Sequence, residues 1–164
     1  MKTLTVYFDY ACPYCLRGHG YLTPLLQELP DISVDWNPCE AHPRPESYGL
    51  HSDLLVCAYY FAKDAGVDIA AFNDRVYTLA QKKRINIEDA KAIADGLADI
   101  LDAKALFDAL VSGKYADECL RANDRAYEEN GVWAVPAYRL NGKKLDATEG
   151  IGVRKEQLEA FLTQ

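Results

Sequence analysis

Asp9-Tyr10-Ala11-Cys12-Pro13-Tyr14-Cys15-Leu16 carries a Cys-x-x-Cys pair where a predicted strand meets a predicted helix. Before it, Leu4, Val6 and Phe8 alternate with more polar neighbours, which predicts a short strand. After it, apolar residues recur at helical spacing and predict a helix to about Leu29: Leu22, Leu25, Leu26 and Leu29. The two cysteines are therefore expected at the start of that helix.

A helix N-terminus changes the chemistry of a thiol placed there. Pro13 suits the first helical position, where a missing N–H costs nothing. Unpaired N–H groups and the helix dipole then favour the thiolate form of Cys12 and lower its pKa. Cys15, one turn on, lies within reach to close a disulfide. The pattern predicts dithiol–disulfide exchange, in which the first cysteine attacks and the second resolves.

Three other interpretations of the pair remain open. A structural disulfide is disfavoured because the chain shows no secretory context. A zinc site would need four ligands, and the conceivable set is Cys12, Cys15, Cys39 and His42. A chance coincidence of spacing is the third alternative. Pro13-Tyr14 after a strand suits redox chemistry better than a zinc knuckle, so we expect no metal.

Composition limits the compartment and the partners. The 164 residues are 49% hydrophobic, which is enough for one domain with a proper core. A net charge of −7 and a pI near 4.9 argue against nucleic acid or an anionic membrane surface as partner. No stretch approaches the length of a membrane span, and the residues after Met1 do not resemble a signal peptide. With an odd number of cysteines as well, we expect a cytoplasmic protein.

The middle of the chain is expected to be helical. Ile32, Val34 and Trp36 predict a second strand, parallel to the first, and a proline-rich loop follows at 37–45. From about 47 to 130 the apolar spacing is helical almost throughout. The first apolar stripe is predicted at Leu50, Leu54, Ala58, Phe61 and Ala65; later helices are predicted to be capped by Asn86 with Asp89, by Asp102, and by Gly113 and Gly131.

The C-terminal part returns to strands. Residues 135–140 precede Asn141-Gly142, the strongest two-residue hairpin signal, and 144–147 would be the antiparallel return. A closing helix contains Leu158, Phe161 and Leu162. Pro136 cannot donate to a sheet and stands at a strand start. Together with the N-terminal Cys-x-x-Cys and this ending, it favours a cis Val135–Pro136 bond.

Several polar and sulfur-containing residues have plain structural interpretations. We expect His19, on the first helix, at the surface, and residues 82–84 as a solvated basic helix end. Cys39, Cys57 and Cys119 are expected to be buried, inert thiols. Pro24 predicts a kink in the first helix.

These features together resemble a known family. The element order β-α-β, helices, β-β-α and the pair Cys12 and Cys15 resemble the thioredoxin fold, an α/β fold. The helical insertion, at 46–130, is similar to that of the DsbA-type branch, with 1–45 and 131–164 forming the thioredoxin-like domain. Residues 8–15, 36–45 and 131–136 resemble FrnE-like and 2-hydroxychromene-2-carboxylate isomerase-like proteins.

The resemblance implies roles for individual residues. It makes Cys12 the nucleophile and Cys15 the resolving thiol, with Pro13 and Tyr14 tuning the redox potential. It places Val135 and Pro136 against the disulfide, where the Val135 backbone pairs with an extended substrate. One departure concerns the buried acid that related enzymes carry six residues before the nucleophile. That position is Val6 here; Asp9 is a candidate replacement, although a loop-capping role is favoured.

The leading function is a thiol–disulfide oxidoreductase acting on protein or low-molecular-weight disulfides, without a bound cofactor. One alternative is a glutathione-dependent isomerase or transferase, with glutathione as co-substrate. Those enzymes generally carry serine at the place of Cys12, which argues against it. Another is an adaptor that binds peptide or metal through its helices. The motif does not define direction, which depends on the potential and the compartment.

Overall fold

The computed structural model describes all 164 residues, and its centre is one four-stranded sheet. The strands are β1 (Lys2–Phe8), β2 (Ile32–Pro38), β3 (Ala137–Leu140) and β4 (Lys143–Asp146), in the order β2-β1-β3-β4. Two helices belong to this part of the chain, α1 (Pro13–Glu28) and α7 (Lys155–Leu162), and they contact each other. The predicted α/β class is confirmed.

The strand pairing follows the sequence prediction. β1 and β2 are parallel, with Leu4 opposite Val34 and Val6 opposite Trp36, because α1 crosses between them. β3 is antiparallel to β1 and to β4. The β3–β4 turn has positive φ at both Asn141 (52°) and Gly142 (76°), the conformation of a type I′ hairpin.

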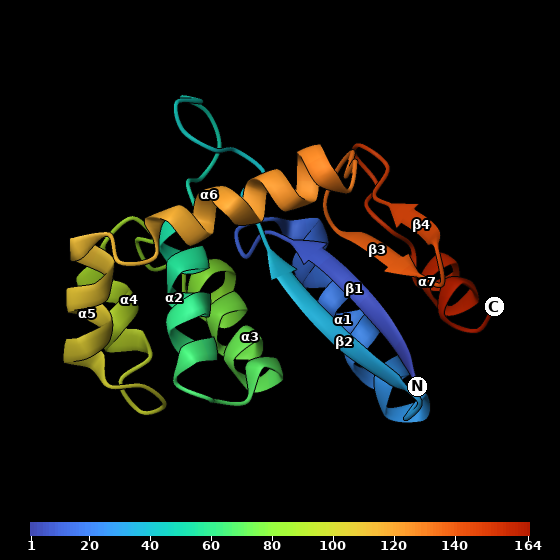
Figure 1. Cartoon of the computed structure of the whole chain (residues 1–164), viewed down its shortest axis with the longest axis horizontal. Helices are drawn as coiled ribbons and strands as arrows, with labels where there is room; N and C mark the ends of the chain where they lie inside the picture. The colour runs from blue at the N-terminus through green and yellow to red at the C-terminus, as the bar shows by residue number, and fades with distance from the viewer.

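Every regular element between β2 and β3 is helical. In order they are α2 (Asp53–Asp64), α3 (Ile69–Tyr77) with the π-helical turn η1 (Thr78–Lys82), α4 (Ala90–Gly96), α5 (Ala103–Ser112), and α6 (Ala116–Asp124) with the π-helical turn η2 (Arg125–Glu129). Figure 1 shows α2 to α5 grouped beside the sheet, and α6 running from that group across to the β3–β4 end. None of the helices combines the length and the apolarity needed to span a membrane.

Helix ends follow the residue pattern with one difference: Asp89 alone caps α4, and Asn86, its predicted partner, accepts the Glu88 N–H at 3.0 Å in the turn before the helix. The carboxylates of Asp89 and Asp102 accept backbone N–H groups of Lys91 and Ala105 at 2.9 and 3.1 Å, so both cap their helices. Gly113 ends α5 in the left-handed conformation.

Two predictions about exposure are wrong. Leu50 was expected on the first helical stripe but is 57% exposed, because the chain stays irregular until α2 begins at Asp53. His19 was expected at the surface, yet its side chain is only 9% exposed. Its ring lies against Trp36 and Tyr77, and its Nε2 is 2.5 Å from the Asp74 carboxylate.

Candidate active site

The two cysteines of the motif stand at the beginning of α1. Cys12 is the N-cap residue in extended conformation, and Pro13 follows at the first helical position, as predicted. The N–H groups of Cys15 and Leu16 donate to the Cys12 carbonyl at 3.1 Å. Cys12 is partly exposed, whereas Cys15 is 1% exposed. Only the first thiol is therefore open to a substrate.

The protein shifts the acidity of the two thiols in opposite directions. The pKa of Cys12 lies below its ordinary value, chiefly because the Cys15 thiol donates a hydrogen bond to its sulfur, which outweighs the opposing effect of burial. The backbone N–H groups of Cys15 and Tyr14 act in the same direction. Burial raises the pKa of Cys15 well above its ordinary value. The pair thus consists of one accessible thiol that ionises more readily than usual and one buried thiol that ionises less readily.

The peptide bond between Val135 and Pro136 is cis, as predicted, and this loop faces Cys12. The Cys12 sulfur lies 3.9 Å from the Val135 carbonyl oxygen. A second cis bond, Arg44–Pro45, lies in the irregular segment before α2 and was not predicted. The structure therefore brings together two of the predicted site segments, which are more than a hundred residues apart in the chain.

A largely buried ion pair holds the loop before Pro136 in place. The Asp146 carboxylate of β4 accepts the Trp133 N–H at 2.8 Å and pairs with the Arg139 guanidinium of β3. Arg139 also donates to the Asn130 carbonyl at 3.1 Å. Both ends of the loop are thus fixed to the hairpin, while the Trp133 side chain is 81% exposed.

A groove of about 350 Å³ runs past the Cys12 sulfur. Its lining consists of Cys12, Tyr14, Ala41, Tyr127, Trp133, Ala134, Val135 and the segment 147–150. The Arg17 guanidinium lies 5.3 Å from the centre of the Tyr14 ring and donates to the Ile151 carbonyl. Most of the lining is apolar, so the groove suits an extended chain with apolar side chains.

Asp9 caps the loops beneath the cysteines. Its two carboxylate oxygens accept the N–H groups of Ala11 at 2.8 Å and Ala41 at 2.7 Å, and its own N–H donates to the Cys15 sulfur at 3.4 Å. Burial raises the pKa of Asp9. The loop-capping role expected for this residue is confirmed. Val6, at the position of the acid that related enzymes carry, is a buried part of β1.

Gln81 of η1 also reaches the motif, and the sequence analysis missed it. Its amide nitrogen donates to the carbonyls of Tyr10 at 2.7 Å and Cys12 at 2.9 Å. The sequence around it reads as a basic helix end, and Lys82 to Arg84 are indeed exposed. No local signal separates Gln81 from that run, because its partners lie about seventy residues away.

The other cysteines are buried and protonated. Burial raises the pKa of Cys39 and of Cys57 to about 12, and raises that of Cys119 as well. The Cys119 thiol donates to the buried Glu40 carboxylate at 3.4 Å. No three His, Cys, Asp or Glu side chains are grouped as metal ligands, so the structure does not assemble the zinc set Cys12, Cys15, Cys39 and His42.

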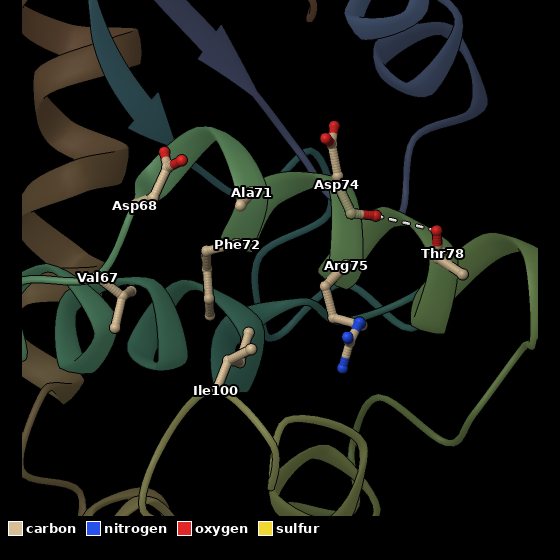
Figure 2. Close-up of a pocket in the computed structure, with 8 residues that line it drawn as sticks. All are labelled: Val67, Asp68, Ala71, Phe72, Asp74, Arg75, Thr78 and Ile100. Carbon is tan, nitrogen blue, oxygen red and sulfur yellow. Dashed lines mark hydrogen bonds between the residues drawn. The ribbon is translucent and has the colours of Figure 1, made fainter.

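Another hollow, of about 440 Å³, lies on α3 and holds no reactive group (Figure 2). Its polar side chains serve structural contacts: the Arg75 guanidinium pairs with Asp99, and the Thr78 hydroxyl donates to the Asp74 carbonyl at 3.0 Å. The Asp74 carboxylate is the partner of His19. The groove at Cys12 is therefore the candidate site.

The chain is similar to known proteins in sequence. The model of the family described as "DSBA-like thioredoxin domain" matches residues 3–161. A thiol:disulfide interchange protein DsbL from Lelliottia amnigena is 30% identical over 92% of this chain and 72% of that protein.

Solved structures share the fold. A probable DsbA oxidoreductase from Streptomyces coelicolor superimposes with a TM-score of 0.80 at 17% identity, covering 100% of this chain and 89% of that one. A 2-hydroxychromene-2-carboxylate isomerase gives 0.75 at 15% identity, covering 98% and 93%. The match over residues 3–161 is decisive: the chain belongs to the DSBA-like thioredoxin domain family, which is a family of enzymes.

Proposed function

We propose that this protein is a thiol–disulfide oxidoreductase in which Cys12 is the nucleophile and Cys15 the resolving thiol. The observation that carries the proposal is the contrast between the two thiols: one partly exposed with a lowered pKa, the other buried with a raised pKa. The thiolate is the attacking species in exchange, so Cys12 meets the substrate first.

The reaction needs only the two sulfurs and the substrate. The Cys12 thiolate attacks one sulfur of a substrate disulfide, the S–S bond breaks, and a substrate thiolate leaves. The Cys15 thiol then loses its proton, which the departing thiolate takes up, and attacks Cys12 in the mixed disulfide. The second substrate sulfur leaves as a thiolate and takes a proton from water, so the substrate becomes a dithiol. The protein then holds a Cys12–Cys15 disulfide, two electrons have passed to the substrate, and no bound cofactor is required.

Val135 and Pro136 are proposed to bind the substrate beside Cys12. Neither the N–H nor the C=O of Val135 is bonded to another backbone group of the protein. An extended substrate can therefore pair with this residue as an added strand does. Disulfide-bearing proteins and low-molecular-weight disulfides, glutathione disulfide among them, are both candidate substrates. Pro13 and Tyr14 are proposed to tune the potential.

Direction depends on the compartment. The odd number of cysteines favours a reducing compartment such as the cytoplasm. There the resting form would be the dithiol, and the protein would work as a reductase or isomerase. A measured potential decides the direction.

The test is equilibration of the protein in glutathione redox buffers, followed by intact mass. We expect a reversible loss of two hydrogens that disappears in Cys12→Ser and persists in Cys57→Ala, a control at a buried thiol outside the groove. No transition in the unmodified protein would reject the proposal. Glutathione held without exchange would point instead to the isomerase or transferase class.

A further inference from the structure

Gln81 connects the helical part of the chain to the backbone on either side of Ala11. One amide nitrogen donates to two carbonyls, those of Tyr10 and Cys12, at 2.7 and 2.9 Å. Both partners are acceptors only, so the nitrogen and not the oxygen of the amide must face them. The two bonds use both hydrogens of that nitrogen. Glutamate and methionine, which have similar shapes, cannot make either bond.

The two carbonyls depend on this contact to different degrees. No backbone N–H reaches the Tyr10 oxygen, so Gln81 is the donor that the protein gives it. The Cys12 oxygen already receives the N–H groups of Cys15 and Leu16. Gln81 therefore adds a third donor to the first carbonyl of α1 and fixes the turn that precedes it.

The π-helical turn brings Gln81 to this position. η1 continues α3 from Thr78 to Lys82, and two residues later Arg84, with a φ of +54°, turns the chain away. Turns of this kind widen the helix by one residue and recur at functional sites. Leu79 and Ala80 are buried in the core, which fixes the turn against the rest of the protein.

We propose that Gln81 is a positioning residue for the exchange reaction, holding the Tyr10–Cys12 backbone so that the Cys12 sulfur stays at the N-terminus of α1. One of its N–H groups binds the carbonyl of the residue that carries the sulfur, and together the two groups offset the negative ends of the Tyr10 and Cys12 carbonyls, which disfavour a thiolate at Cys12. The inference rests on the proposed function, and it makes the helical part of the chain a contributor to the redox site.

The test compares Gln81→Met, Gln81→Glu and Gln81→Lys with the unmodified protein. Methionine removes the donors, glutamate replaces them with a charged acceptor, and lysine restores donors through its ammonium group. Gln27→Met is the control, since Gln27 is exposed on α1 and makes no side-chain hydrogen bond. The readout is the pKa of Cys12 in reduced protein, from thiolate absorbance against pH and from alkylation rates. The other ionisable groups around Cys12, namely Tyr14, Cys15, Asp9, Tyr127 and Glu149, are unchanged.

We expect Gln81→Met to raise the pKa of Cys12 by about one, which lowers its thiolate fraction about tenfold at a pH below both values. Gln81→Glu should raise it further, and Gln81→Lys should return it to the original value or below. An unchanged pKa in Gln81→Met, with far-ultraviolet circular dichroism showing folded protein, would overturn the proposal whatever the charged variants do. If Gln81→Met does not fold, the neutral variant Gln81→Ala replaces it, and an unchanged Cys12 pKa in folded Gln81→Ala would overturn the proposal in the same way.

This experiment separates the two proposals. A pKa that depends on Gln81 in a protein that never exchanges disulfides would reject the oxidoreductase and keep the positioning role. If exchange is lost in Cys12→Ser while the pKa of Cys12 is the same in every Gln81 variant, the oxidoreductase proposal stands and the positioning role of Gln81 is rejected.

Discussion

Gly18 of α1 lies directly beneath the cis-proline loop, and a methyl group there should disturb both stability and the site. A Cβ atom at Gly18 would lie 2.6 Å from the Tyr138 hydroxyl and 3.4 Å from Pro136 Cγ. Tyr138 is 1% exposed, and its hydroxyl is the end of a rigid ring with no room to swing away. Gly20, on the same helix, would meet nothing within 4 Å. The two glycines therefore form a matched pair.

The two alanine variants should differ by the cost of overpacking alone. Replacing glycine by alanine inside a helix stabilises it by about 0.8–1.0 kcal/mol, and this gain applies to both positions. Forcing extra volume into a packed core costs about 1–3 kcal/mol, and only Gly18→Ala bears it. Gly20→Ala should thus unfold about 2–4 °C higher than the unmodified protein, whereas Gly18→Ala should gain nothing or lose up to about 2 kcal/mol.

Urea unfolding of the reduced proteins measures this difference, and the disulfide-exchange rate measures its consequence at Pro136. We expect Gly18→Ala to be about 1–3 kcal/mol less stable than Gly20→Ala and slower in exchange. Equal stabilisation by the two substitutions would refute the reasoning, because it would mean that Tyr138 and Pro136 move aside at no cost.

Three further predictions concern the site and its surroundings. Cys15→Ala should accumulate mixed disulfides at Cys12, visible as mass adducts; their absence after incubation with a disulfide substrate would contradict the resolving role. Trp133→Ala should raise KM for a peptide disulfide several-fold with little change in kcat. Tyr48→Ala, at another exposed aromatic residue, should leave KM unchanged. Equal effects of the two substitutions would show that Trp133 does not bind the substrate. Burial raises the pKa of Glu40 above its ordinary value of 4.5, so the folded state binds this proton more tightly than the unfolded state. The stability of the unmodified protein relative to Glu40→Gln should therefore fall as pH rises above about 4.5. Urea midpoints of the two proteins that change in parallel between pH 4 and 8 would contradict this.

Local patterns predicted the elements that carry the site. The spacing before and after Cys12 gave β1 and α1 because alternation and helical periodicity are properties of neighbouring residues. Asn141-Gly142 predicted its turn for the same reason, since both residues tolerate positive φ. The burial of Cys119 on α6 agrees with the expectation for a lone thiol.

Features that depend on distant partners were not predictable in this way. The His19 side chain is largely buried because Trp36 of β2 and Tyr77 of α3 pack against it. The residues next to His19 in the sequence do not indicate these two contacts. Leu50 fits a helical stripe by spacing, but Gly49 adopts a φ of +78° beside it and the chain remains irregular. Gln81 could not be singled out, since its role arises from contacts with carbonyls of a loop near the N-terminus.

The acid beneath the cysteines shows how the site tolerates the departure at Val6. Asp9 opposes the Cys12 thiolate by its charge, yet the hydrogen bond from Cys15 has the larger effect, and the pKa of Cys12 still lies below its ordinary value. Both Asp9 oxygens are occupied by backbone N–H groups, from Ala11 and Ala41. A carboxylate bound in this way orders two loops and is poorly placed to take the Cys15 proton. On the proposed mechanism we therefore expect that proton to pass to the substrate thiolate, so that Cys15 is deprotonated only when a substrate has reached Cys12.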